Sequence, residues 1–201
     1  MSVVLAPPTR STLLDLVDRS RVRDAVAIVG FALLTALAAQ ISIPLGFTPV
    51  PVTGQTFAVL LAGGVLGSRR GALSMGLYVA LGAIGLPFYS EGEGGWTAAT
   101  GATAGYLVGF VVAAFVVGLM AERGQDRRLS TSVPAFLAGS AIIYACGAAW
   151  LAYDLGLPLT AGPGESSAIS LGVAPFLVGD VLKALLAGAL MPAAWAVVDE
   201  R

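Results

Sequence analysis

Residues 173–190 read VAPFLVGDVLKALLAGAL, an apolar run in which Asp180 and Lys183 are the only charged residues. An apolar stretch of this length predicts a membrane-spanning helix, and a spacing of three residues places both charges on one helical face. If the helix begins near Ala174, Asp180 lies about 9 Å and Lys183 about 13 Å below the membrane boundary. Each charge at such a depth costs about 2.5–3.5 kcal/mol on insertion scales, so both need compensation. A polar ligand site that faces an outward cavity would compensate both charges. The alternative is a salt bridge between the two residues that holds the helix bundle together.

The composition of the whole chain agrees with a membrane protein. Of the 201 residues, 57% are hydrophobic and 11% are charged, whereas about one quarter of an average soluble domain is charged. A soluble fold of this size could not bury so much apolar surface. The net charge of −1 provides no field that would recruit a nucleic acid, so we expect no such partner.

Hydropathy along the chain predicts an all-α protein with six transmembrane helices. A polar segment, residues 1–24, precedes a single membrane domain, residues 25–198. The expected spans are residues 25–43, 55–66, 71–86, 101–121, 133–153 and 171–198.

The positive charges predict the orientation of these spans. With six spans, every Lys and Arg except Lys183 falls on one side of the membrane, and the loops on the other side hold Glu91, Glu93, Asp154 and Glu165. By the positive-inside rule, both termini are cytoplasmic, which predicts a multi-pass protein of the cell membrane.

Two irregular segments fall on the outer side. Residues 43–55 contain Pro44, Pro49 and Pro51, with the polar side chains of Thr48, Thr53, Gln55 and Thr56 close by. Broken backbone at membrane depth lines a cavity or is buried in protein, and a short span behind it indicates a binding site in transporters; an ordinary loop with stiff turns is the alternative. The second segment, residues 82–106, combines many glycines with Trp96, whose indole belongs either to a pocket or to an interfacial aromatic belt.

Small residues predict where helices approach one another closely. Gly101, Gly105 and Gly109 recur at four-residue spacing, as do Ala32 and Ala36. Such edges let helices meet in lipid, either within one chain or between subunits.

The scarcity of histidine and cysteine restricts the possible chemistry. The chain has no histidine, and its single cysteine is Cys146. Imidazole bases, imidazole metal ligands and an internal disulfide are therefore excluded, and we expect no metal, no cofactor and no enzymatic activity. An intramembrane enzyme would have to use carboxylate or lysine chemistry, for example with Ser140 or Ser170, but their spacing does not support it. The chain also lacks the GxxxxGK[ST] motif, so any ATP-driven step requires a partner.

Four segments carry further motifs in chain order. They are PVPVTGQ (residues 49–55, similar to PVPxTxQ), the glycine-rich residues 71–88, GATAGYL (residues 101–107, similar to GPTGGYL) and FLVGDVLK (residues 176–183, similar to FxxGDxxK). Together they resemble the BioY family, the biotin-binding S components of energy-coupling factor (ECF) vitamin transporters. Ala102 and Ala104 stand where that family usually has Pro and Gly, so the wall of the pocket is expected to differ there.

The resemblance implies a function and a set of partners. It implies a biotin pocket open to the outside beneath the first loop, and coupling to a transmembrane subunit and two ATP-binding subunits. It also implies that Ala32 and Ala36 contact the transmembrane subunit. The competing hypothesis is a stand-alone carrier for another small polar solute, driven by protons or another gradient, with Asp180 as a titrating relay.

The chemistry of biotin suits the charged pair. Its ureido ring has two N–H donors and one carbonyl acceptor, so an ionised Asp180 accepts from it and Lys183 donates to it. Lys183 meeting the tail carboxylate instead remains an alternative. The residues expected to complete the site are Pro51, Thr53 and Gln55 in the lid, and Trp96, Thr103 and Tyr106 in the pocket wall.

Overall fold

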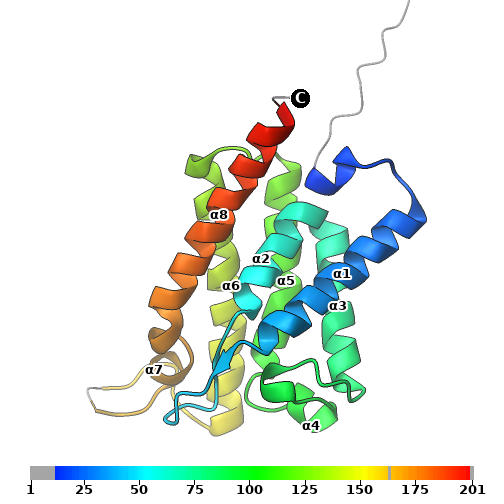
Figure 1. The fold of residues 1–201 in the computed structure, drawn as a ribbon. Helices are drawn as coiled ribbons and strands as arrows, with labels where there is room; N and C mark the ends of the chain where they lie inside the picture. Colours follow the sequence, from blue (N-terminus) through cyan, green and yellow to red (C-terminus); the bar gives the residue numbers. More distant parts are fainter. Residues whose placement is uncertain (1–11, 163, 200–201) are drawn as a thin grey trace, which may run out of the picture.

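The computed structural model describes residues 12–162 and 164–199, and most of this chain is helical (Figure 1). The long helices are α1 (Arg21–Ala39), α2 (Gln55–Leu66), α3 (Ser68–Ala83), α5 (Ala104–Glu122), α6 (Leu129–Leu155) and α8 (Leu177–Asp199). The short elements are η1 (Leu13–Leu16), β1 (Ser42–Ile43), β2 (Val52–Thr53), η2 (Ser90–Gly92), α4 (Trp96–Ala99), α7 (Ala168–Gly172) and η3 (Ala174–Phe176).

Four segments of the described chain are long and apolar enough to cross a membrane. They are α1, α5, α6 and the continuous stretch Ala168–Val198, which contains α7, η3 and α8. The apolar helix α2 has 12 residues, or about 18 Å of helix. These helices make the chain a multi-pass membrane protein.

Helix α5 lies at the centre of the bundle (Figure 1) and packs against α2, α3 and α6. Within the apolar window of each helix, 61% of α5 is buried, against 22% of α1, which lies at the edge and packs on α3 and α2. Helix α8 packs against α6 and α2, on the side of the bundle away from α1 (Figure 1).

Glycines allow a tight turn and a close helix contact. Gly67 alone joins α2 to α3, at φ +83°, a conformation that favours glycine. A Cβ on Gly105 would lie 2.3 Å from Trp150 Cβ, and one on Gly109 would lie 3.0 Å from Ile143 Cα. The expected glycine edge therefore packs α5 on α6 within the chain, except that Gly101 precedes the helix.

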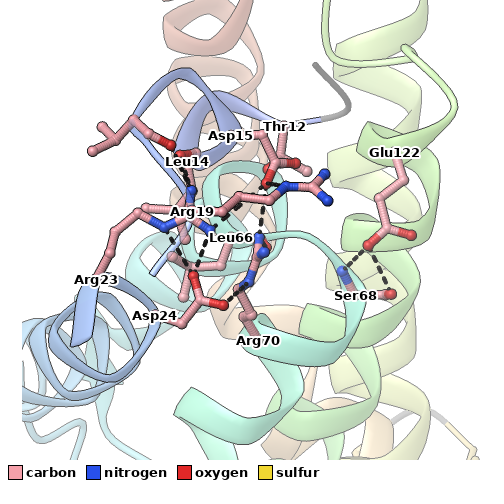
Figure 2. A network of polar contacts seen from close by, with 11 residues as sticks. Thr12, Leu14, Asp15, Arg19, Arg23, Asp24, Leu66, Ser68, Arg70 and Glu122 are labelled. Carbon is pink, nitrogen blue, oxygen red and sulfur yellow. Dashed lines mark hydrogen bonds and ion pairs between the residues drawn. The ribbon is translucent and has the colours of Figure 1, made fainter. Parts of the chain in front are cut away.

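The end of the bundle where α1 begins and α8 ends, which we call the arginine end, carries an ion-pair network (Figure 2). Arg70 contacts both Asp15, at 3.2 Å from Nη1 to Oδ1, and Asp24, at 3.1 Å from Nε to Oδ2. Asp24 also pairs with Arg23, and the buried Thr12 donates to Asp15. The network fastens η1 and the start of α1 to the α2–α3 turn.

Every described arginine belongs to the arginine end. These residues are Arg19, Arg21, Arg23, Arg69, Arg70, Arg123, Arg127 and Arg128. Arg10 and Arg201, which were expected on the same side, lie outside the described residues, as does the first part of the polar segment 1–24. Figure 1 shows the β1–β2 hairpin, α4 and α7 at the opposite end, which we call the pocket end.

Only the expected span 55–66 has the same bounds as its helix, and the ends of the other five differ by one to six residues. Two of these differences have a clear local cause. The first helix spans residues 21–39 rather than 25–43, because the Ser20 hydroxyl caps it by accepting from the Arg23 N–H, and residues 42–43 form β1. The last span is not one helix from residue 171. It breaks into α7, η3 and α8, because Pro175 lacks a backbone donor and interrupts a continuous helix.

Candidate functional site

The charged pair lies at the start of α8, at the pocket end of the bundle. Asp180 occupies the first turn of this helix, where the helix dipole favours a negative charge. Lys183 Nζ contacts Asp180 Oδ1 at 2.6 Å and donates to the Thr53 carbonyl oxygen at 2.6 Å. The helix that carries the pair begins at Leu177, three residues later than the start near Ala174 that the sequence suggested.

Donors from two further helices complete the surroundings of Asp180. Thr56 of α2 donates to Oδ1 at 3.0 Å, and Tyr144 of α6 donates to Oδ2 at 2.6 Å. Only 5% of Asp180 is exposed, and a carboxylate at that burial is stable only when it is hydrogen-bonded and paired. Three donors from α2, α6 and α8 supply this compensation.

The first loop, residues 40–54, is tied to the helices around it. Thr53 Oγ1 donates to Gln55 Oε1 at 2.7 Å, and Gln55 Nε2 donates to the Tyr78 hydroxyl at 2.5 Å. Thr48 Oγ1 donates to the Leu171 carbonyl oxygen at 2.8 Å. These bonds hold the loop across the space between α2 and the start of α8.

A cavity of about 60 Å³ lies beneath this loop. Its lining consists of Val50, Pro51, Val52, Thr53, Gln55, Thr56, Tyr89, Ser90, Thr103, Tyr106, Leu107, Phe110, Ile143, Tyr144, Phe176, Asp180 and Lys183. Small-molecule pockets commonly measure about 300–1,000 Å³. This cavity is therefore smaller than a typical ligand pocket.

The structure brings most of the sequence-predicted residues together. Asp180, Lys183, Pro51, Thr53, Gln55, Thr103 and Tyr106 all line the cavity. The Tyr106 hydroxyl also donates to the Gly172 carbonyl oxygen at 2.6 Å, so it connects α5 to the segment that precedes α8.

Trp96 does not line this cavity, contrary to the prediction. It begins the short helix α4, which packs on α3 and α5, and 73% of the residue is exposed. An exposed indole at this end of the bundle fits the interfacial aromatic belt that the sequence left as the alternative.

Ala32 and Ala36 are buried within the chain, with 0% and 7% of each residue exposed. Between them, Thr35 is also buried and contacts Met75 of α3. In this arrangement the alanine edge packs α1 against its own bundle, so the expected contact of these two residues with another subunit is not available.

Four polar residues of the cavity lining were not in the predicted set: Thr56, Tyr89, Ser90 and Tyr144. Of these, Tyr144 contacts Asp180 from a helix in which no site residue was expected. Its signal was a phenol inside the apolar stretch 133–153, since a tyrosine hydroxyl in such a place needs a partner. The apolar lining residues, such as Leu107, Phe110, Ile143 and Phe176, carry no comparable signal, because in sequence they resemble any packed helix face.

No group of three or more Cys, Asp or Glu residues that could hold a metal ion occurs within residues 12–162 and 164–199. The polar groups of the cavity are instead one carboxylate, one ammonium, an amide and several hydroxyls. This set suits a ligand with both hydrogen-bond donors and acceptors.

Comparison with known proteins gives consistent matches. The model of the BioY family matches residues 10–200. The biotin transporter BioY of Rhodobacter capsulatus is 43% identical over 169 residues, covering 81% of this chain and 88% of the relative. The biotin transporter BioY of Thermotoga maritima is 40% identical over 160 residues, covering 78% of this chain and 86% of the relative.

One solved structure shares the fold. It is the crystal structure at 2.1 Å of the S-component for biotin from an ECF-type ABC transporter, with a TM-score of 0.76 and 27% sequence identity. The match covers 88% of this chain and 94% of that chain. The resemblance seen in the four sequence motifs is thereby confirmed: this chain belongs to the BioY family.

Proposed function

We propose that this chain is the biotin-binding S component of an ECF-type uptake transporter. The observation that carries the proposal is the Asp180–Lys183 pair, which faces a cavity beneath a proline-containing loop at the pocket end. The family match and the relatives named as biotin transporters support the same conclusion.

The Asp180–Lys183 pair forms hydrogen bonds with the ureido ring of the ligand. Asp180 already accepts three hydrogen bonds, but a carboxylate offers about four lone-pair sites. The Lys183 ammonium has three donors, of which two contact Asp180 and Thr53. One acceptor site and one donor therefore remain for a ligand N–H and carbonyl, in a setting where charge-assisted bonds are strong.

Six helices cross the plasma membrane in this proposal, with both termini in the cytoplasm. The short α2 and the less apolar α3 complete the set of four long spans, since both are flanked by other helices of the bundle. The arginine end then faces the cytoplasm, as the positive-inside rule requires. Residues 25–198 form one membrane domain whose cavity opens outward.

Energy for uptake comes from partner subunits. The family resemblance implies a transmembrane coupling subunit and two ATP-binding subunits, and the chain itself acts as a carrier rather than an enzyme. Because Ala32 and Ala36 are buried, contact between α1 and a coupling subunit has to use its exposed face, which includes Val26, Leu33 and Leu37.

A binding assay on the purified chain tests the proposal. The chain in detergent is titrated with biotin and with a panel of other vitamins, without partner subunits. Saturable binding of biotin, and of no other vitamin at comparable concentration, is the expected result. Binding of a different vitamin in preference to biotin would contradict the proposal.

A further inference from the structure

A second hollow lies beside the cavity that contains Asp180 and Lys183. Its volume is about 520 Å³, and its lining consists of Pro49, Pro51, Ser90, Glu91, Glu93, Gly94, Thr97, Ala98, Gly101, Ala102 and Thr103. Three of these residues, Pro51, Ser90 and Thr103, also line the inner cavity. We call this space the outer hollow.

The outer hollow is negatively charged. Glu91 and Glu93 are exposed and contribute to its lining, and no Lys or Arg does. Apart from Lys183, every described cation belongs to the arginine end, at the opposite end of the bundle. Lys183 is engaged with the Asp180 carboxylate, so the field in the outer hollow is set by the two glutamates.

The shape and charge of the two spaces suit different parts of biotin. The inner cavity, about 60 Å³, holds the complementary donor and acceptor groups for a neutral ureido head. The larger outer hollow then receives the flexible tail. A tail that ends in a carboxylate meets like charges there without a compensating cation, whereas an amide meets none of this repulsion and an ammonium is attracted.

From this arrangement, and resting on the function proposed above, we infer that the outer hollow is a tail subsite that accepts biotin conjugated through its carboxylate. The substrate class is biotin amides, with preference for those that carry a cationic group beyond the amide bond. Free biotin binds through its ureido head, and its tail carboxylate weakens the binding because it meets like charges. In this orientation Lys183 contacts the ureido carbonyl and not the tail.

Competition binding on the purified full chain tests the inference. Labelled biotin is displaced by three probes: unlabelled biotin, its neutral N-methyl amide, and its amide with ethylenediamine, which ends in an ammonium. The expected order of affinity at low ionic strength is the ammonium form, then the neutral amide, then biotin. Higher salt should narrow the differences, because it screens exposed charges.

A pair of substitutions that removes charge but nearly preserves side-chain shape separates the two effects. The double variant Glu91→Gln/Glu93→Gln should tighten biotin and weaken the ammonium form, each by about two- to fivefold, and leave the neutral amide unchanged. The matched control is Asp154→Asn/Glu165→Gln, which removes two negative charges from exposed positions outside both cavities. This control should change none of the three affinities.

The outcomes distinguish this inference from the proposed function. If biotin binds tightly but neither amide displaces it, the tail subsite is wrong while biotin binding stands. If both amides bind but the Glu91/Glu93 variant shifts no affinity, or shifts all three alike, the electrostatic preference is wrong. If biotin itself does not bind, the proposed function fails together with the inference.

Discussion

The carboxylate of Asp180 receives donors from Thr56, Tyr144 and Lys183, which lie on three different helices. A sequence reveals only part of such a site. Asp180 and Lys183 stand out because they are charged residues within an apolar run. Inserting such charges into a membrane costs free energy, which indicates that they have a role. Tyr144 lies in a helix 36 positions earlier in the chain, and only the packing of α6 against α8 shows that its hydroxyl points to Asp180.

Tyr144→Phe should weaken biotin binding without changing the shape of the pocket wall. The phenol donates to Asp180 Oδ2 at 2.6 Å, and a hydrogen bond to a charged group contributes about 1.5–3 kcal/mol. If about that energy holds the carboxylate in its binding position, affinity falls roughly 10- to 100-fold. Titration calorimetry on the purified variant measures this change.

Tyr153→Phe is the matched control for that substitution. It removes the same hydroxyl from the same helix, but Tyr153 is 79% exposed and lies outside the cavity. Its affinity for biotin should equal that of the unmodified chain. Equal affinities for the two variants would show that the Tyr144 hydroxyl does not position Asp180.

At the scale of elements, hydropathy predicted the helices well and their ends less well. Residues 55–66 agree with α2. The first residues of α1 and α8, however, depend on the capping Ser20 and on Pro175, and hydropathy averaged over a window does not detect either effect. Helix orientation was harder still. The stripe of Ala32 and Ala36 suits close packing with any neighbour, and only the fold shows that the neighbour belongs to the same chain.

Gly105→Ala should destabilise the contact between α5 and α6. The added Cβ would lie 2.3 Å from Trp150 Cβ and 2.4 Å from the Cys146 carbonyl oxygen, and overpacking of this kind costs about 1–3 kcal/mol. Thermal unfolding in detergent should show a lower midpoint.

Gly30→Ala serves as the control for Gly105→Ala. Gly30 is also helical, but a Cβ there meets nothing within 4 Å, so the gain in helix propensity should leave stability equal or slightly higher. Equal losses at both positions would contradict the packing described for α5 and α6.

Arg70→Gln should loosen the arginine end. It removes the contacts with Asp15 and Asp24 and leaves the buried Asp15 side chain, 5% exposed, with less compensation. Partly buried networks of this kind contribute about 1–3 kcal/mol, so the unfolding midpoint should fall. Biotin affinity should stay unchanged, because the pocket end is not involved.

Arg69→Gln tests whether this effect is specific. The neighbouring Arg69 is exposed, and exposed charges typically contribute about 0–1 kcal/mol. Its unfolding midpoint should stay close to that of the unmodified chain. A loss as large as that of Arg70→Gln would mean that charge alone, rather than the network in Figure 2, stabilises this end.

For the whole molecule, the distribution of charge predicted more than any single motif. The separation of the arginines from Glu91, Glu93, Asp154 and Glu165 could be read directly from the sequence once the apolar segments were marked. The size of the cavity and the exposed position of Trp96 could not, because both depend on how the loops at the pocket end fold over the helices.

Labelling of introduced cysteines should show which end of the molecule faces outward. In a Cys146→Ala background, Glu165→Cys should react with a membrane-impermeant maleimide on intact cells. Arg69→Cys should react only after the membrane is permeabilised. Labelling of Arg69→Cys on intact cells would contradict the proposed orientation.

The most direct test of the account is the biotin affinity of Asp180→Asn and Lys183→Met, measured by titration calorimetry on the purified chain. The Asn side chain keeps an acceptor for the Tyr144 hydroxyl. Each variant is measured at a temperature below its unfolding midpoint, so that only folded protein is compared. If the pair reads the ureido head, each substitution should weaken binding at least roughly tenfold, since charge-assisted hydrogen bonds contribute about 1.5–3 kcal/mol. Affinities close to that of the unmodified chain for both folded variants would show that the pair locks the helices and does not read the ligand.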